Sequence, residues 1–158
     1  MPLTLNIRHV EKKDQHLEGD LPAKELDLEL HDETMRPAGP LQYDLEAQLL
    51  EGAILVRGSL RLPLDCVCVR CLKKFRRPIE LEHWTCHLPL SGDDSVKVNN
   101  DLVDLTPQIR EDILLALPQH PLCEPECRGL KLPASVKDPG RMSEKTSSAW
   151  DELNKLKL

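Results

Sequence analysis

The alternation of apolar and polar residues between positions 41 and 67 most narrowly limits the folds open to this chain. The stretch LQYDLEAQLL alternates with a period of two, and so does AILVRGSLRLPLDCVCV, which follows the dipeptide Glu51-Gly52. A period of two is typical of a half-buried strand, and a short glycine-containing link between two such strands predicts an antiparallel hairpin. We therefore expect a long hairpin here, with a bulge or an edge feature at Gly58 or Pro63.

Three further segments alternate in the same way and predict strands. They are LTLNIRHV from residue 3, ELDLEL from residue 25 and FRRPIELEHWTCHLPL from residue 75. In the last of these, Ile79 and Leu81 are expected on one face of the strand, and Trp84 and Cys86 on the other.

The best helix signal lies near residues 106–117. Thr106 suits the N-cap, Pro107 suits the first helical position, and apolar residues recur at helical spacing until Pro118 ends the run. With the strands, this helix predicts an α+β fold dominated by antiparallel sheet.

The domain organisation follows from composition. Residues 1–130 are expected to form a single α+β domain, because 158 residues suffice for one hydrophobic core. Residues 131–147 have few apolar side chains and are expected to be a mobile linker. Residues 148–158 place Trp150 and Leu153 at amphipathic spacing and predict a short C-terminal helix.

The location of the protein is expected to be cytoplasmic. No apolar run approaches the roughly 20 residues that a membrane-spanning helix needs, and the amino-terminal residues do not resemble a signal peptide. Structural disulfides are unusual in a reducing cytosol, so the six cysteines suggest metal ligands or redox groups first.

Two cysteine pairs have the spacing of metal ligands. Cys68 and Cys71 form a Cys-x2-Cys pair, and Cys123 and Cys127 form a Cys-x3-Cys pair. Two such pairs can hold one zinc ion in a tetrahedral site. The pairs are separated by 51 residues, more than in a compact zinc ribbon, so tertiary folding has to bring them together.

Two other interpretations of the thiols remain open. All six can be small hydrophobic side chains without metal, which is the expectation for Cys86, whereas Cys66 suits either the core or a substitute ligand. The Cys-x2-Cys pair can also be a redox motif. Such motifs usually sit at a helix N-terminus in a βαβ context, whereas this pair follows a strand.

A cluster of positive charge surrounds the first cysteine pair. Residues 57–77 hold seven basic residues against Asp65 alone, in a chain whose net charge is −6. Such a cluster predicts contacts with RNA phosphates. An alternative is a solvated strand edge whose charges block aggregation. The predicted RNA-binding residues are Arg57, Arg61, Arg70, Lys73, Lys74, Arg76 and Arg77.

Several of these features together resemble the YceD-like family, the large ribosomal RNA subunit accumulation proteins. The likeness covers roughly residues 41–130 and the carboxyl-terminal WDELNKLKL. The sequence departs from the family pattern after Gly129-Leu130, where many relatives have further cysteines. Because those thiols are missing here, a metal site has to use the two earlier pairs. The matching positions are Cys68, Arg70, Cys71, Leu72, Phe75, Asp104, Leu105, Glu111, Ile113, Leu117, Pro118, Cys123, Cys127, Gly129 and Leu130.

The resemblance implies a non-catalytic cytoplasmic protein that supports large-subunit ribosomal RNA accumulation through contacts with that RNA or with ribosomal proteins. No hydrolase, zinc-protease or nucleotide-binding motif is present in the sequence, which favours a protein that is not an enzyme. Two alternatives stay open: a zinc-binding adaptor that contacts only proteins, and a thiol oxidoreductase that uses Cys68 and Cys71.

Overall fold

The computed structural model describes residues 2–28, 30 and 33–131. The predicted C-terminal helix over 148–158 lies outside the described residues, as does the predicted linker over 131–147 apart from Lys131. In chain order the elements are β1 (Thr4–Asn6), α1 (Ile7–Lys12), β2 (Gln15–Leu21), β3 (Met35–Pro37), β4 (Leu41–Leu50), β5 (Ala53–Val67), β6 (Lys74–Pro89), β7 (Val98–Asn99), β8 (Leu102–Asp104) and α2 (Thr106–Ala116). The fold is a strand-rich α+β fold, as predicted.

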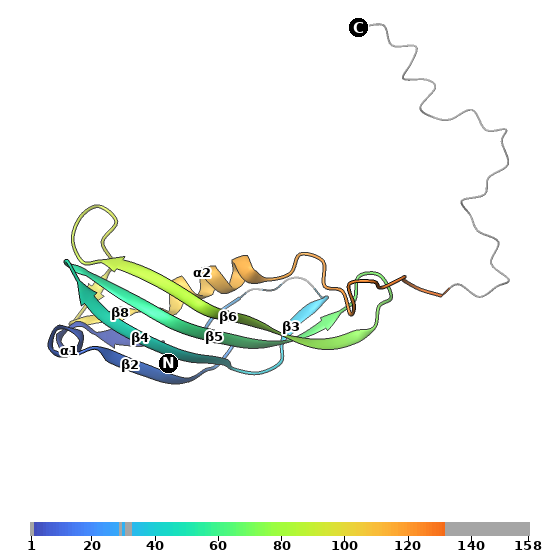
Figure 1. Ribbon diagram of the computed structural model, residues 1–158, viewed down its shortest axis with the longest axis horizontal. Helices are drawn as coiled ribbons and strands as arrows, with labels where there is room; N and C mark the ends of the chain where they lie inside the picture. Colours follow the sequence, from blue (N-terminus) through green and yellow to red (C-terminus); the bar gives the residue numbers. More distant parts are fainter. Residues whose placement is uncertain (1, 29, 31–32, 132–158) are drawn as a thin grey trace, which may run out of the picture.

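The main sheet has five antiparallel strands and is built around β5. Strand β6 pairs with β5 along its whole length, while β4 and then β3 share the opposite edge, and β2 pairs with β4. A smaller antiparallel sheet has the order β1-β8-β7. Figure 1 shows the long, curved main sheet with α2 lying over one face.

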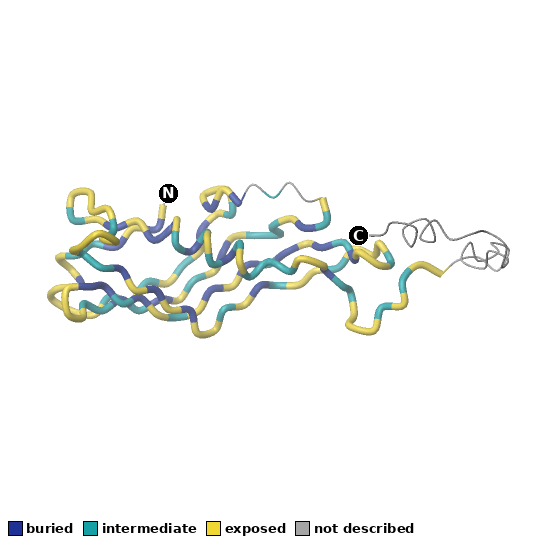
Figure 2. Tube along the Cα trace, turned by 90° about the horizontal axis from the view of Figure 1, so that it is seen from above, coloured by how far each residue is buried: buried dark blue, intermediate teal, exposed yellow. Residues whose placement is uncertain are grey.

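The predicted β4–β5 hairpin is present, with Glu51 and Gly52 as its turn. Both residues have positive φ, 48° and 83°, as the tight type I′ hairpin turn requires. Along β5 the even-numbered side chains point into the core and the odd-numbered ones mostly face solvent. Figure 2 shows this alternation of buried and exposed residues along the long strands.

The predicted irregularity lies at Gly58, and its main effect is on β6. Gly58 pairs with Trp84 and Leu60 pairs with Leu81, so two residues of β6 oppose Ser59 alone. This bulge changes which side of β6 faces inward. Ile79 is buried before the bulge, and Trp84 is buried after it. The expectation that these residues occupy opposite faces along the whole strand is therefore wrong.

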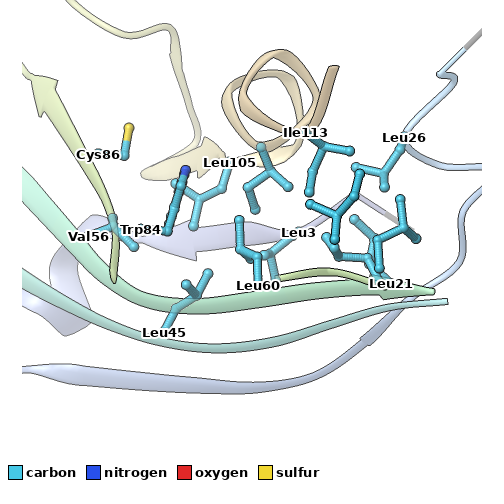
Figure 3. Packing of buried hydrophobic residues seen from close by; sticks show 14 of the residues in the cluster. Leu3, Leu21, Leu26, Leu45, Val56, Leu60, Trp84, Cys86, Leu105 and Ile113 are labelled. Atoms are coloured by element: carbon cyan, nitrogen blue, oxygen red, sulfur yellow. The ribbon is translucent and has the colours of Figure 1, made fainter. Parts of the chain in front are cut away.

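The hydrophobic core lies between the inner face of the main sheet and a layer made of α2 and the smaller sheet. Ile109 and Ile113 of α2 are fully buried, and Leu5 and Val103 reach the core from the smaller sheet. Leu60 and Trp84 meet them from the main sheet (Figure 3). Burying each such side chain stabilises the fold by about 1.5–3 kcal/mol.

Two of the predicted strands are different in the structure. Only Thr4–Asn6 of the first is extended, because Asn6 Oδ1 accepts a hydrogen bond from the Arg8 amide and caps helix α1. In the second, residues 25–27 form a turn, in which the Asp27 amide donates to the Lys24 carbonyl. Leu26 and Leu28 are nevertheless buried, so the apolar residues pack into the core without joining a sheet.

Helix α2 makes one polar contact at its N-terminus and another with strand β6 of the main sheet. The Asp104 carboxylate caps its first turn by accepting from the Thr106 amide, so Thr106 is the first helical residue and not the predicted N-cap. Asp112 Oδ2 accepts a hydrogen bond of 2.6 Å from Trp84 Nε1 on β6. None of the described helices is long and apolar enough to span a membrane.

We expect Asp112→Ala to destabilise the fold by about 1–3 kcal/mol, because it leaves the N–H of the buried Trp84 indole without an acceptor. Urea unfolding measures the change. Glu111→Ala is the matched control, since its exposed carboxylate lies one position away, and it should change stability by less than about 0.5 kcal/mol. Equal effects of the two substitutions would show that the hydrogen bond from Trp84 to Asp112 does not stabilise the fold.

Candidate metal centre and charged surface

The first cysteine pair lies in the turn that joins β5 to β6. The Cys68 amide donates to the Lys73 carbonyl, and the Leu72 amide donates to the Cys68 carbonyl, both at 2.9 Å. Leu72 has a φ of 61°, which closes the turn. The backbone amides of Cys71 and Arg70 point at the Cys68 sulfur. A Cys-x2-Cys turn with inward-pointing amides is the form in which proteins present two thiolates to one metal ion.

The second pair lies in the segment that follows α2, and hydrogen bonds hold this segment beside the hairpin turn. The Val69 amide donates to the Pro121 carbonyl at 3.0 Å, and Arg70 Nη1 donates to the Cys127 carbonyl at 3.0 Å. Figure 1 shows the segment passing beside the turn between β5 and β6. The structure thus brings the two pairs together across the 51 residues between them.

The four sulfurs form a compact cluster. The Sγ atoms of Cys68 and Cys127 are 3.7 Å apart, those of Cys71 and Cys123 are 3.6 Å apart, and all four lie within 4.8 Å of one another. Tetrahedral zinc with Zn–S bonds of about 2.3 Å requires sulfurs about 3.8 Å apart. The cluster therefore has the donor set and the size of a structural zinc site, and it can bind a metal such as zinc.

The pKa values of these thiols are shifted in opposite directions. Hydrogen bonds from backbone amides, chiefly that of Cys71, lower the pKa of Cys68 to about 6. Burial and the neighbouring sulfurs raise the pKa of Cys123 to about 12. The Gly129 amide lowers the pKa of Cys127, but burial and nearby thiols outweigh it and leave that pKa raised. Several thiolates can coexist here only if a positive ion neutralises them.

The other two cysteines do not belong to the cluster. Cys66 and Cys86 are buried in the hydrophobic core, on β5 and β6. Burial raises the pKa of both thiols, that of Cys86 to about 11. Cys86 is thus a core residue as expected, and of the two roles considered for Cys66 the structure places it in the core.

The seven predicted RNA-binding cations are not gathered on one face. Three of them lie on the outer face of the main sheet, and each pairs with the carboxylate directly opposite on the neighbouring strand. The pairs are Arg57–Glu46 at 3.0 Å, Arg61–Glu80 at 3.2 Å and Arg76–Asp65 at 2.8 Å. This part of the sheet carries nearly balanced charge, so RNA phosphates would have to compete with carboxylates.

The remaining four cations lie elsewhere. Arg77 stands opposite Leu64 on the inner side of the sheet, with its guanidinium 5.6 Å from the centre of the Phe75 ring. Arg70 joins the two cysteine segments. Lys73 and Lys74 are exposed beside the cysteines, and neither has a carboxylate partner among the described residues. Lys73 and Lys74 therefore place positive charge without a described carboxylate partner at the end of the hairpin.

Exposed apolar side chains at the same end were not predicted from the sequence. Val69 is 42% exposed, Leu72 62% and Leu130 60%, on the two segments that carry the cysteines. We call the end of the molecule formed by residues 68–74 and 121–131 the cysteine tip. Only Val69 had a sequence signal, because a side chain inside a tight Cys-x2-Cys turn has no core to enter.

Fold and site together define a strand-rich α+β protein whose longest hairpin ends in a cluster of four cysteines that could bind a metal such as zinc. The chain belongs to the family described as "Large ribosomal RNA subunit accumulation protein YceD", whose model matches residues 56–157. The resemblance inferred from the sequence is thereby confirmed.

Similar proteins occur in mycobacteria. Uncharacterized proteins of Mycobacterium tuberculosis and Mycobacterium bovis are each 26% identical over 148 residues, covering 79% of this chain and 72% of their own. An uncharacterized protein of Mycobacterium leprae is 23% identical over 128 residues, covering 74% of this chain and 59% of its own. No solved structure matches the chain with significant similarity.

Proposed function

We propose that this protein is a non-catalytic cytoplasmic protein that supports the accumulation of large-subunit ribosomal RNA, and that it contacts the RNA through the cysteine tip. The observation that carries the proposal is the position of Lys73 and Lys74. They are exposed next to the four-cysteine cluster, whereas Arg57, Arg61 and Arg76 on the outer face of the sheet are paired with carboxylates. The family description supplies the link to large-subunit RNA.

The composition of the site favours a structural role for the metal. Four cysteine sulfurs fill the four positions of a tetrahedral ion, whereas catalytic zinc sites keep one position for water or substrate. The tip then acts as a rigid support. Its backbone hydrogen bonds and its metal fix the direction in which the two lysines point.

The geometry also argues against a thiol oxidoreductase. The shortest sulfur contacts join Cys68 to Cys127 and Cys71 to Cys123, across the two segments rather than within the Cys-x2-Cys pair. The pair also lies at the end of a hairpin, without the helix N-terminus that lowers the pKa of a redox thiol in such motifs.

The number of free cations predicts the salt dependence of RNA binding. Two lysines that each neutralise one phosphate of single-stranded RNA contribute about −1.4 to the slope of log K against log salt concentration. We expect Lys73→Gln/Lys74→Gln to weaken binding to large-subunit RNA fragments and to reduce the slope by about this amount. Fluorescence anisotropy at several salt concentrations measures both quantities.

Arg57→Gln/Arg61→Gln is the matched control, since it removes the same charge from the paired outer face. It should leave affinity and slope nearly unchanged. In cells that carry only the lysine variant, the ratio of large-subunit to small-subunit ribosomal RNA is expected to fall. Equal RNA binding by the wild type and both variants would refute the RNA contact.

The exposed apolar side chains of the tip favour a second candidate function, a zinc-binding adaptor for a ribosomal protein. Leu72 and Leu130 suit a protein surface better than a phosphate backbone. If the protein acts as this adaptor, Leu72→Ser should abolish its support of large-subunit ribosomal RNA levels in cells. The purified wild type and all of the variants should then show no RNA binding.

A further inference from the structure

A cavity of about 270 Å³ lies between the inner side of the β5–β6 hairpin and the carboxyl end of α2. Phe75, Ile79 and Leu81 form its wall on the sheet, and Ala116 and Pro118 form the wall on the helix side. An apolar cavity of about 150 Å³ is enough to bind benzene. This one therefore has room for a larger aromatic side chain.

The charge at the cavity is positive. Arg77 lines it, and this guanidinium has no carboxylate partner among the described residues. Glu80 lines the cavity as well, but its carboxylate pairs with Arg61 at 3.2 Å. An apolar cavity with one unpaired cation selects a ligand in which an aromatic group lies next to an acidic group.

The chain itself contains such a group outside the described residues. Its carboxyl-terminal segment AWDELNKLKL, residues 149–158, places Trp150 directly before Asp151 and Glu152. Eighteen residues lie between Lys131 and Trp150, so the two Cα atoms can be at most about 63–68 Å apart. The family match continues to residue 157, so this segment belongs to the family's sequence and is not particular to this chain.

We propose that the cavity is the binding site for the Trp150 indole of the chain's own carboxyl-terminal segment, with Arg77 pairing with the adjacent carboxylates. A linker of this length holds the indole at a millimolar effective concentration, so weak affinity is enough for occupancy. Docking closes the apolar gap beside α2 and keeps the carboxyl terminus close to the sheet.

The test uses the full-length chain labelled with 5-fluorotryptophan. Its only tryptophans are Trp84 and Trp150, so two fluorine resonances result, and Trp150→Phe assigns them. In the wild type, the Trp150 resonance is expected to lose most of the shift that an exposed indole shows between H₂O and D₂O. Ala116→Phe fills the cavity and should restore that shift. The Trp84 resonance reports that each variant is folded, because Trp84 lies in the core.

Charge reversal tests the contact at Arg77. Arg77→Glu should expose Trp150, and adding Asp151→Arg/Glu152→Arg to it should restore docking. Arg76→Glu is the matched control, because Arg76 faces the opposite side of the sheet and pairs with Asp65. A fully exposed Trp150 in the wild type, insensitive to Ala116→Phe, would overturn the proposal. So would protection that disappears on dilution, since the site would then bind the segment of a second copy.

Discussion

Full-length protein purified under reducing conditions without a metal-binding tag is expected to contain about one equivalent of zinc, and Cys71→Ser is expected to lose nearly all of it. Three thiolates remain in the variant, but the serine hydroxyl does not ionise and leaves the tetrahedron incomplete. Structural zinc is bound with an apparent free energy of about 10–16 kcal/mol in zinc-finger peptides, so the loss of one ligand has a large effect. Elemental analysis of the purified protein measures the result.

The loss should be accompanied by a local structural change. The amides of Cys68, Val69 and Leu72 are hydrogen-bonded within and across the cysteine tip, and their hydrogen exchange should become faster without metal. Amides in the middle of β4 and β5 should remain protected. Cys86→Ala serves as the control, because this buried cysteine lies outside the cluster and the variant should retain its zinc. Less than about half an equivalent of zinc in the purified wild type would contradict the assignment of a metal site to the four cysteines.

Gly58→Ala is expected to cost about 3–5 kcal/mol, a large part of the 5–15 kcal/mol by which domains are stable. A Cβ atom at this position would lie 2.0 Å from the Asp44 carbonyl oxygen and 2.8 Å from the Leu45 Cα atom. Both are backbone atoms of β4, which cannot move without breaking the β4–β5 pairing. The φ of 155° adds strain for any residue with a side chain. Thermal or urea unfolding measures the change.

Gly52→Ala separates the two causes. Gly52 also has positive φ, at 83°, but a Cβ atom there would meet nothing within 4 Å. It should therefore cost only the strain of the left-handed conformation, about 1–2 kcal/mol. If Gly58→Ala were no worse than Gly52→Ala, the close approach of β4 to β5 would not constrain this position.

Prediction of the fold from sequence succeeded where one residue pattern continued without interruption. The period of two across 41–67, with Glu51-Gly52 between its halves, specified the hairpin and its register. It failed in β6, because the bulge opposite Ser59 shifts the inward-facing positions by one residue. Both halves of that strand carry apolar residues, so the sequence of β6 itself shows no sign of the shift, and the only signal is Gly58 on the neighbouring strand. The strand predicted over residues 25–30 is absent from the described residues for another reason. Leu26 and Leu28 are buried, and burial gives the same apolar-polar alternation whether or not a sheet forms.

The sequence predicted which four cysteines come together, but not the surface around them. Ligand spacing identified the four cysteines, since two closely spaced pairs are what a tetrahedral ion requires. Counting charge along the sequence grouped seven cations that the fold then separated. Arg76 and Arg77 are neighbours in sequence, yet they point to opposite sides of the sheet, toward Asp65 and toward the Phe75 ring. Strand register decides which carboxylates lie opposite Arg57 and Arg61, and a count of charges along the sequence carries no information about register.

The position of the four cysteines has a topological consequence. An ion bound to both pairs closes the polypeptide between Cys71 and Cys123 into a ring that contains β6, the smaller sheet's β7 and β8, and α2. For a cross-linked loop of about fifty residues, the reduced entropy of the unfolded chain is worth about 4 kcal/mol. Unlike a disulfide, this closure needs no oxidant and is reversed by any stronger chelator. The part of the fold between Cys71 and Cys123 would thus gain or lose stability with the supply of metal in the cell.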